Sequence, residues 1–219
     1  MKNAPKGILF DLDGTLVDSA PAAIEATQQA FKEFEMPPPD RDAILALMGI
    51  PIEESFPILG GPNYATSQHL QVLEKFREIY LPICIQKTIL FSGIGRMLKI
   101  LHEQGSILAV VTSKKSTATY AILEALKIRQ LFSVIVCSDH VTHYKPHPAP
   151  ALTAIGLAKL TPRDCIMVGD STFDIQMGKD AGCSTCAVSW GSHSVEALKQ
   201  SHPTYLINAP SELPQIFTP

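Results

Sequence analysis

The chain has 219 residues, of which 46% are hydrophobic and 18% are charged, and its net charge at pH 7 is −3. This composition supplies enough apolar side chains for a folded core and excludes the clustered basic surface that nucleic-acid binding requires. Its apolar runs, such as Ile107–Val111, are far shorter than the ~20 residues that cross a bilayer, and no signal-peptide core follows Met1, so we expect a cytoplasmic protein that binds no membrane.

The first expected element is a short buried strand, Gly7–Phe10, and carboxylates follow it directly. The segment from 19 to 86 then contains no convincing strand. Apolar side chains recur there at helical spacing, from Ala23 onward and again from Leu70 onward. We therefore expect a helical insertion over residues 17–86.

After this insertion, strand patterns alternate with helical ones. Four apolar runs are typical of strands buried on both faces: residues 107–112, 133–137, 165–168 and 185–189. This alternation predicts an α/β fold with a Rossmann-like, doubly wound parallel sheet. Residues 1–16 and 87–219 would form the sheet domain, and residues 17–86 an inserted helical-bundle domain.

Carboxylates gather directly after two of the expected strands. Asp11 and Asp13 follow the first strand, and Asp170 and Asp174 follow the strand at 165–168. The carboxyl ends of parallel strands form the ligand crevice of such a sheet, so these side chains are expected to converge. Carboxylates that converge repel one another and need a cation, and an all-oxygen site suits Mg²⁺.

Groups suited to anion binding lie at two further strand ends. Thr112 and Ser113 follow one strand just before an expected helix, where free backbone N–H groups attract anions. Lys145 lies in a loop stiffened by Pro146 and Pro148. An acidic metal site beside an anion site indicates phosphoryl chemistry.

These residues resemble a known family. Asp11-Leu12-Asp13-Gly14-Thr15 after a strand, then Thr112-Ser113, the Lys145 loop and Gly169-Asp170-x-x-x-Asp174, occur in the order typical of haloacid dehalogenase superfamily phosphatases with a helical cap after the first strand. The resemblance implies Mg²⁺-dependent hydrolysis of a small phosphorylated metabolite, of the phosphoglycolate type, through an aspartyl-phosphate intermediate.

The resemblance also implies a role for each motif residue. Asp11 would be the nucleophile, and Asp13 the acid that protonates the leaving group and later activates water. Mg²⁺ would be held by Asp11, by the backbone carbonyl of Asp13 and by Asp170. Asp174 would be a second acidic contact to the metal or a brace for Lys145. The residues expected to grip the phosphate are Thr112, the Ser113 amide and Lys145.

Several alternatives stay open from the sequence. Asp13 argues against carbon–halogen cleavage, because dehalogenases of this superfamily lack that carboxylate. An inorganic pyrophosphatase and a β-phosphoglucomutase-like sugar-phosphate mutase remain possible, although the arginine expected near Gly49 in a mutase is missing. A phosphate-sensing or partner-binding scaffold without turnover is the non-enzymatic alternative. The expected partner is a small phosphate ester, and the composition is compatible with a monomer or a homodimer.

Histidines and cysteines carry weaker signals. His143 and His147 flank Lys145 and could touch substrate or cap, but the prolines there disfavour a helical zinc site. The five cysteines are an odd number in a chain too large to need disulfides. Cys183 and Cys186 belong to an apparent strand, so we expect the cysteines to be small buried apolar residues.

Overall fold

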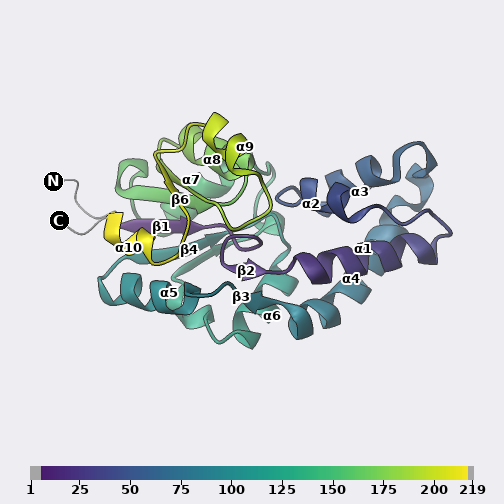
Figure 1. Ribbon diagram of the computed structural model, residues 1–219, viewed down its shortest axis with the longest axis horizontal. Helices are drawn as coiled ribbons and strands as arrows, with labels where there is room; N and C mark the ends of the chain where they lie inside the picture. Colours follow the sequence, from purple (N-terminus) through teal and green to yellow (C-terminus); the bar gives the residue numbers. More distant parts are fainter. Residues whose placement is uncertain (1–5, 217–219) are drawn as a thin grey trace.

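The computed structural model describes residues 6–216, and a six-stranded sheet lies at its centre (Figure 1). The strands are β1 (Gly7–Phe10), β4 (Ile107–Val111), β5 (Val134–Val136), β6 (Cys165–Gly169), β7 (Ser184–Val188) and β8 (Tyr205–Ile207). Their order is β5-β4-β1-β6-β7-β8, and every neighbouring pair is parallel. The predicted doubly wound parallel sheet is confirmed, and β1 lies at the point where the strand order reverses.

The observed strands differ from the predicted ones mainly at their ends. The runs predicted at 107–112, 133–137 and 185–189 each extend one residue too far, because the chain there already turns into the loop that follows. The edge strand Tyr205–Ile207 was not predicted. It has three residues and only Ile207 is fully buried, so its apolar pattern is too short to stand out.

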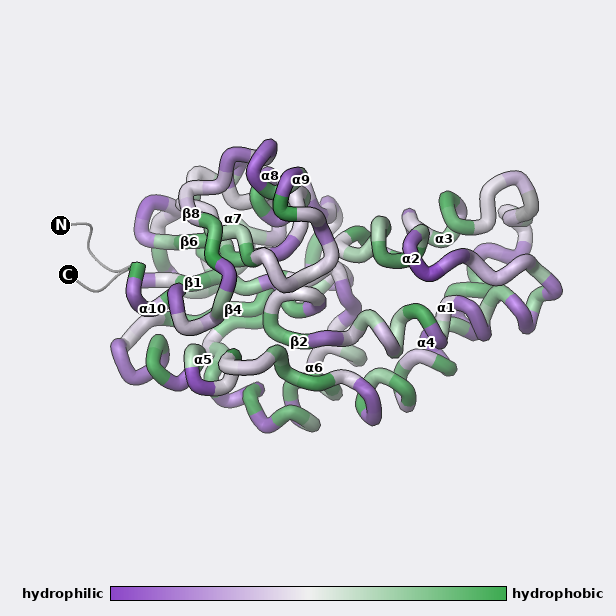
Figure 2. The backbone as a smooth tube through the Cα atoms, in the orientation of Figure 1, coloured by the Kyte–Doolittle hydropathy of each residue, from purple (hydrophilic) through white to green (hydrophobic). Residues whose placement is uncertain are grey.

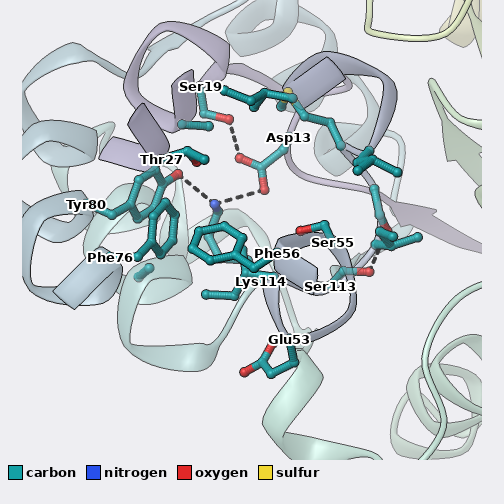
Figure 3. A pocket seen from close by; sticks show the side chains of 18 of the residues that line it. Asp13, Ser19, Thr27, Glu53, Ser55, Phe56, Phe76, Tyr80, Ser113 and Lys114 are labelled. Carbon is teal, nitrogen blue, oxygen red and sulfur yellow. Dashed lines mark hydrogen bonds and ion pairs between the residues drawn. The ribbon is translucent and has the colours of Figure 1, made fainter. Parts of the chain in front are cut away.

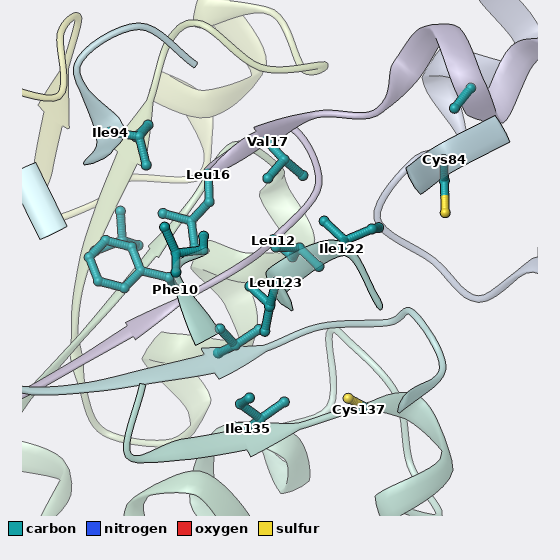
Figure 4. Close-up of a cluster of buried hydrophobic side chains, with 14 of the residues drawn as sticks. Phe10, Leu12, Leu16, Val17, Cys84, Ile94, Ile122, Leu123, Ile135 and Cys137 are labelled. Atoms are coloured by element: carbon teal, nitrogen blue, oxygen red, sulfur yellow. The ribbon is translucent and has the colours of Figure 1, made fainter. Parts of the chain in front are cut away.

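Both faces of the sheet are covered, as the alternation of side chains along β1 requires. Ile8 and Phe10 belong to one core cluster, and Leu9 belongs to another on the opposite face. Helices α5 (Ile94–Glu103) and α6 (Ser116–Ala125) contribute to the first cluster, and α7 (Ala149–Leu157) and α8 (Thr172–Asp180) to the second. Figure 4 shows the first cluster around Phe10 and Leu123.

Shorter helical segments complete the sheet-containing part of the molecule. These are α9 (Val195–Gln200), α10 (Glu212–Ile216), η3 (Arg129–Leu131), η4 (Ser138–His140) and η5 (Pro162–Asp164). No helix in the described part of the chain is both long enough and apolar enough to cross a membrane.

The segment between β1 and β4 contains helices that project away from the sheet (Figure 1). They are α1 (Ala20–Glu33), α2 (Arg41–Ala46), α3 (Ile52–Gly60) and α4 (His69–Lys87), with the short turns η1 (Gly61–Asn63) and η2 (Thr66–Gln68). Hydrophobic and hydrophilic stretches alternate along α1 and α4, which pack along each other (Figure 2). Aromatic rings fill the space between these helices, with centroid distances of 5.4 Å for Phe31–Phe56 and 5.0 Å for Phe56–Phe76.

A small antiparallel ribbon joins the inserted helices to the sheet-containing part. Its strands are β2 (Val17–Asp18) and β3 (Ile89–Leu90), and they pair with each other at the two points where the chain passes between the parts. Helix α4 ends at Lys87, one residue beyond the expected insertion. The division into domains at residues 17 and 86 stays a prediction.

Candidate active site

Four loops at the carboxyl edge of the sheet bring the predicted residues together. Asp11 directly follows β1, and its N–H donates to Val168 O at 2.9 Å, so the neighbouring strand holds its backbone. Asp170 follows β6, and Asp174 lies in the first turn of α8. Lys145 reaches the same point from the loop after β5. All four side chains are buried.

Lys145 is the centre of this arrangement. Its Nζ lies 2.5 Å from Asp11 Oδ1 and 2.7 Å from Asp174 Oδ1, and its side chain is 1% exposed. Burial opposes the charge of Lys145, but the two carboxylates outweigh burial and raise the pKa of Lys145 above its ordinary value. Burial raises the pKa of Asp11 well above its ordinary value, against the lowering effect of Lys145. The lysine therefore holds the Asp11 carboxylate in place and partly compensates its charge.

Asp170 is fixed by donors from two loops. Thr15 Oγ1 donates to Asp170 Oδ1 at 3.0 Å, and the N–H and hydroxyl of Ser192 both donate to Oδ2 at 2.7 Å. Two glycines leave space for this carboxylate: a Cβ on Gly14 would lie 2.3 Å from Asp170 Oδ2, and one on Gly191 2.2 Å from Asp170 Cβ. Burial raises the pKa of Asp170, and Asp174 adds to this rise, while the Ser192 hydrogen bonds oppose it.

Both oxygens of Asp174 are already engaged. Besides Lys145 at Oδ1, Oδ2 accepts hydrogen bonds from the Ser171 hydroxyl at 2.6 Å and the Ser171 N–H at 3.2 Å. The Ser171 hydroxyl in turn accepts the N–H of Asp174, which forms a capping box at the start of α8. Of its two expected roles, the geometry favours that of a brace for Lys145.

The donor set fits a divalent cation. Asp11, Asp170 and Asp174 place carboxylate oxygens within 4.8 Å of one another in a buried site. With all three carboxylates ionised, this cluster and Lys145 carry a net charge of −2, which a single Mg²⁺ would neutralise. Oxygen ligands and a partial set of protein donors are what Mg²⁺ prefers. Asp11 and Asp170, two of the predicted ligands, lie in this cluster; the part of the Asp13 carbonyl stays a prediction.

Asp13 borders a cavity beside the inserted helices, and Figure 3 shows its carboxylate between Ser19 and Lys114. The Ser19 hydroxyl donates to its Oδ1, and Lys114 Nζ lies 3.2 Å from its Oδ2. Lys114 also donates to the Tyr80 hydroxyl on α4 at 2.7 Å. Burial, above all, raises the pKa of Tyr80 to about 12, so this hydroxyl keeps its proton. A chain of polar contacts thus runs from the inserted helices to Asp13.

Thr112 and Ser113 border the same cavity as Asp11 and Asp13. The Thr112 hydroxyl accepts the N–H of Lys114 at 3.1 Å, which shapes the turn before α6. The Ser113 hydroxyl donates to Gly49 O at 2.7 Å, in the loop between α2 and α3. The Ser113 side chain therefore contacts the inserted helices, and its backbone remains at the cavity floor.

The two histidines beside Lys145 are not part of this site. His143 and His147 are exposed and stack on each other with ring centroids 4.5 Å apart, and neither borders the cavity. Conversely, Lys114, Tyr80 and Ser192 were not predicted as site residues. Only Lys114 carried a signal, because it directly follows Thr112-Ser113. Tyr80 falls within the helical pattern that begins at Leu70, which gives no sign of a polar role.

The cysteines are free thiols, and four of them are buried as predicted: Cys84, Cys137, Cys165 and Cys186. Cys183 is only partly buried, because it precedes β7 instead of belonging to it. Burial raises the pKa of both Cys183 and Cys186 to about 12, which is the opposite of an activated thiol.

Comparison with known proteins reveals similarity over nearly the whole chain. Residues 8–188 match the profile of haloacid dehalogenase-like hydrolases. A Dickeya dadantii (strain 3937) protein named probable phosphatase IndB is 37% identical, covering 94% of this chain and 90% of that protein. A phosphoglycolate phosphatase of Salmonella paratyphi A is 31% identical, covering 95% and 90%. The crystal structure of a predicted phosphoglycolate phosphatase from Haemophilus somnus 129pt superposes with a TM-score of 0.91 at 27% identity, covering 97% and 98% of the chains.

Proposed function

The chain belongs to the haloacid dehalogenase-like hydrolase family and is a phosphatase, and we propose that it hydrolyses a small phosphorylated metabolite with Mg²⁺ through an aspartyl-phosphate intermediate. The phosphoglycolate phosphatase name of its relatives makes phosphoglycolate the first ester to test. Its substrate partner is accordingly a small phosphate ester.

In the proposed first step, Asp11 attacks the phosphorus atom and the ester P–O bond breaks. Asp11 Oδ1 is held by Lys145, which leaves Oδ2 to form the new bond. The departing oxygen takes a proton from Asp13, which lies two residues further along and borders the same cavity. Dividing the hydrolysis into two displacements replaces one difficult step by two easier ones.

In the proposed second step, water attacks the aspartyl-phosphate. Asp13 now accepts the proton of that water, phosphate leaves, and the Asp11 carboxylate is restored. Ser19 and Lys114 hold the two oxygens of Asp13, which keeps this carboxylate directed at the cavity in both steps. Bulk water has to be excluded from the reacting phosphate until the leaving group has departed. Closure of the inserted helices over the cavity would exclude it.

We assign anion binding to Thr112 and Ser113, which border the cavity, and to Lys145, which contacts the cavity-lining Asp11. Thr112, the Ser113 amide and Lys145 would contact the phosphate oxygens. Bound Mg²⁺ would offset the repulsion between the Asp11 carboxylate and the anionic phosphate. Asp170, held by Thr15 and Ser192, would supply a rigid oxygen to the ion.

One observation supports this function most directly: Asp11 and Asp174 share the buried Lys145 while Asp170 lies beside them, next to a cavity floored by Asp13 and Thr112. We expect Mg²⁺-dependent phosphate release that Asp11→Asn abolishes, with the circular dichroism spectrum unchanged. A hydroxylamine-sensitive phosphoenzyme should form on the parent chain and not on Asp11→Asn.

The matched control is Asp42→Asn, on an exposed turn of α2, which should leave turnover unaffected. Substantial phosphate release by Asp11→Asn would contradict the assignment of the nucleophile. Pyrophosphate and hexose phosphates belong in the same panel, because they test the pyrophosphatase and mutase alternatives. Complete inactivity toward the whole panel would favour the non-enzymatic scaffold.

A further inference from the structure

The cavity beside Asp13 has a definite size. It occupies about 140 Å³ between the inserted helices and the strand-end loops (Figure 3). Apolar cavities of about 150 Å³ hold one benzene molecule. Because Asp11, Asp13 and Thr112 lie at the cavity floor, a phosphate bound there would direct its ester group into this space. An ester group of about the size of one six-membered ring therefore fits this space.

The walls of the cavity are mostly apolar. They come from α1, from α3 and from the loop between α2 and α3, and include Ala23, Leu47, Met48, Ile50, Ile52 and Phe56. Two of the polar side chains that also face it are bonded within the protein. The Ser19 hydroxyl donates to Asp13, and the Tyr80 hydroxyl accepts from Lys114. A strongly polar ester group would lose its hydration against these apolar walls.

The cations around the cavity are paired as well. Lys114 contacts Asp13 and Tyr80. At the partly exposed rim, Arg77 Nη2 lies 2.5 Å from Glu53 Oε1, and Lys115 Nζ lies 3.4 Å from the same oxygen. A carboxylate on the ester group would have to share these cations with Glu53. One buried donor, Arg77 Nε–H, has no partner and could serve a single neutral acceptor.

Resting on the proposed phosphatase function, we propose that the preferred substrate is a phosphate monoester whose leaving group is uncharged, largely apolar and about the size of one ring. This ester group occupies the cavity between Asp13 and the apolar walls of the inserted helices. The small anionic leaving group of phosphoglycolate has little apolar surface to bury in this space.

Three primary alkyl esters test this proposal, because their leaving groups are of similar basicity: benzyl phosphate, propyl phosphate and phosphoglycolate. We expect kcat/KM for benzyl phosphate to exceed that for each of the other two at least tenfold with Mg²⁺ present, since each well-packed methylene changes specificity about tenfold or more. A value for phosphoglycolate or propyl phosphate that equals or exceeds that for benzyl phosphate overturns the proposal. No hydrolysis of the three esters while pyrophosphate or a hexose phosphate is hydrolysed overturns this proposal alone. Inactivity toward all of these compounds overturns the proposed hydrolysis of small phosphate esters, and this inference with it.

Two variants change the cavity in opposite ways. Ala23→Leu fills it from α1 and should lower the ratio of kcat/KM for benzyl phosphate to that for phosphoglycolate at least tenfold. Leu47→Arg, at a half-buried position after α2, introduces an unpaired cation and should lower the same ratio by raising turnover of phosphoglycolate.

The control is Ala46→Leu, which makes the same substitution at an exposed position and should leave both values of kcat/KM unchanged. Ratios that stay within threefold of the parent value in both cavity variants overturn the placement of the leaving group. Because one variant adds bulk and the other adds charge at a different position, a folding defect in one leaves the other informative.

Discussion

Replacing Lys145 by methionine removes the only cation that contacts Asp11 and Asp174 among the described residues, while nearly keeping the side-chain volume. The parent cluster carries −2 without metal, and Lys145→Met would leave −3 in a site where the lysine is 1% exposed. Removing one partner of a buried ion pair costs about 3–5 kcal/mol, because the remaining charge is uncompensated. For a chain of this size that corresponds to a fall in Tm of about 6–20 °C.

Thermal unfolding in EDTA and in excess Mg²⁺ measures this effect. We expect the fall in Tm to be largest in EDTA and smaller in Mg²⁺, because the ion supplies the missing positive charge. The loss should also shrink as the pH falls. Burial already raises the pKa of Asp11, and removing Lys145 raises it further, so a proton taken up by Asp11 relieves the repulsion.

Two further variants make the measurement specific. Lys99→Met removes a surface lysine whose pair with Glu103 is long, at 3.9 Å, and should change stability by less than about 1 kcal/mol. Adding Asp174→Asn to Lys145→Met removes one negative charge as well and should recover part of the loss. A Lys145→Met protein as stable as the parent in EDTA at pH 7 would refute the view that this lysine compensates the buried carboxylates.

Gly191→Ala should displace Asp170 and raise the Mg²⁺ concentration needed for half-maximal activity about tenfold or more. A titration of activity with Mg²⁺ measures this change. Gly156→Ala on α7, where a Cβ would meet open space, is the control and should leave that concentration unchanged. For Asp139, burial raises the pKa but hydrogen bonds from the Ser116 hydroxyl and N–H outweigh it, so the net pKa is lowered. Asp139→Asn should therefore destabilise the protein by less than about 1 kcal/mol at pH 7, and the difference from the parent in urea unfolding should vanish as the pH falls below about 4. Burial raises the pKa of Cys183 and Cys186 to about 12, so a thiol reagent at pH 8 should react only slowly with the folded chain. In urea the same reagent should label all five cysteines. Rapid labelling of the folded chain would contradict this prediction.

The elements that carry the chemistry could be predicted because their signals are local. Asp11 and Asp170 directly follow strands whose apolar runs are unmistakable, and topology alone brings the ends of such strands to one edge. The fold class follows from the same alternation. The sequence could not show how loops from distant parts of the chain meet. Thr15 and Ser192, for example, donate hydrogen bonds to the two different oxygens of Asp170.

The cavity was equally hidden from the sequence. Tyr80 and Phe56 look alike in a helical pattern, yet the hydroxyl of Tyr80 binds Lys114 while Phe56 lines the space for the ester group. Which face of each inserted helix looks toward Asp13 depends on how α1 and α4 pack, and no local motif records that packing. Substrate choice is therefore the part of the function that only the three-dimensional structure addresses.

The paired strands β2 and β3 have a consequence for how such a protein can diversify. The chain leaves the sheet-containing part at Val17–Asp18 and returns at Ile89–Leu90, and these two points are hydrogen-bonded neighbours. Segments whose ends lie together can be exchanged or resized with little strain on the host. The helices between them can therefore change to fit a new ester group while Asp11, Lys145 and Asp170 keep their positions. Substrate selectivity can in this way change without a change in the residues proposed for the chemistry.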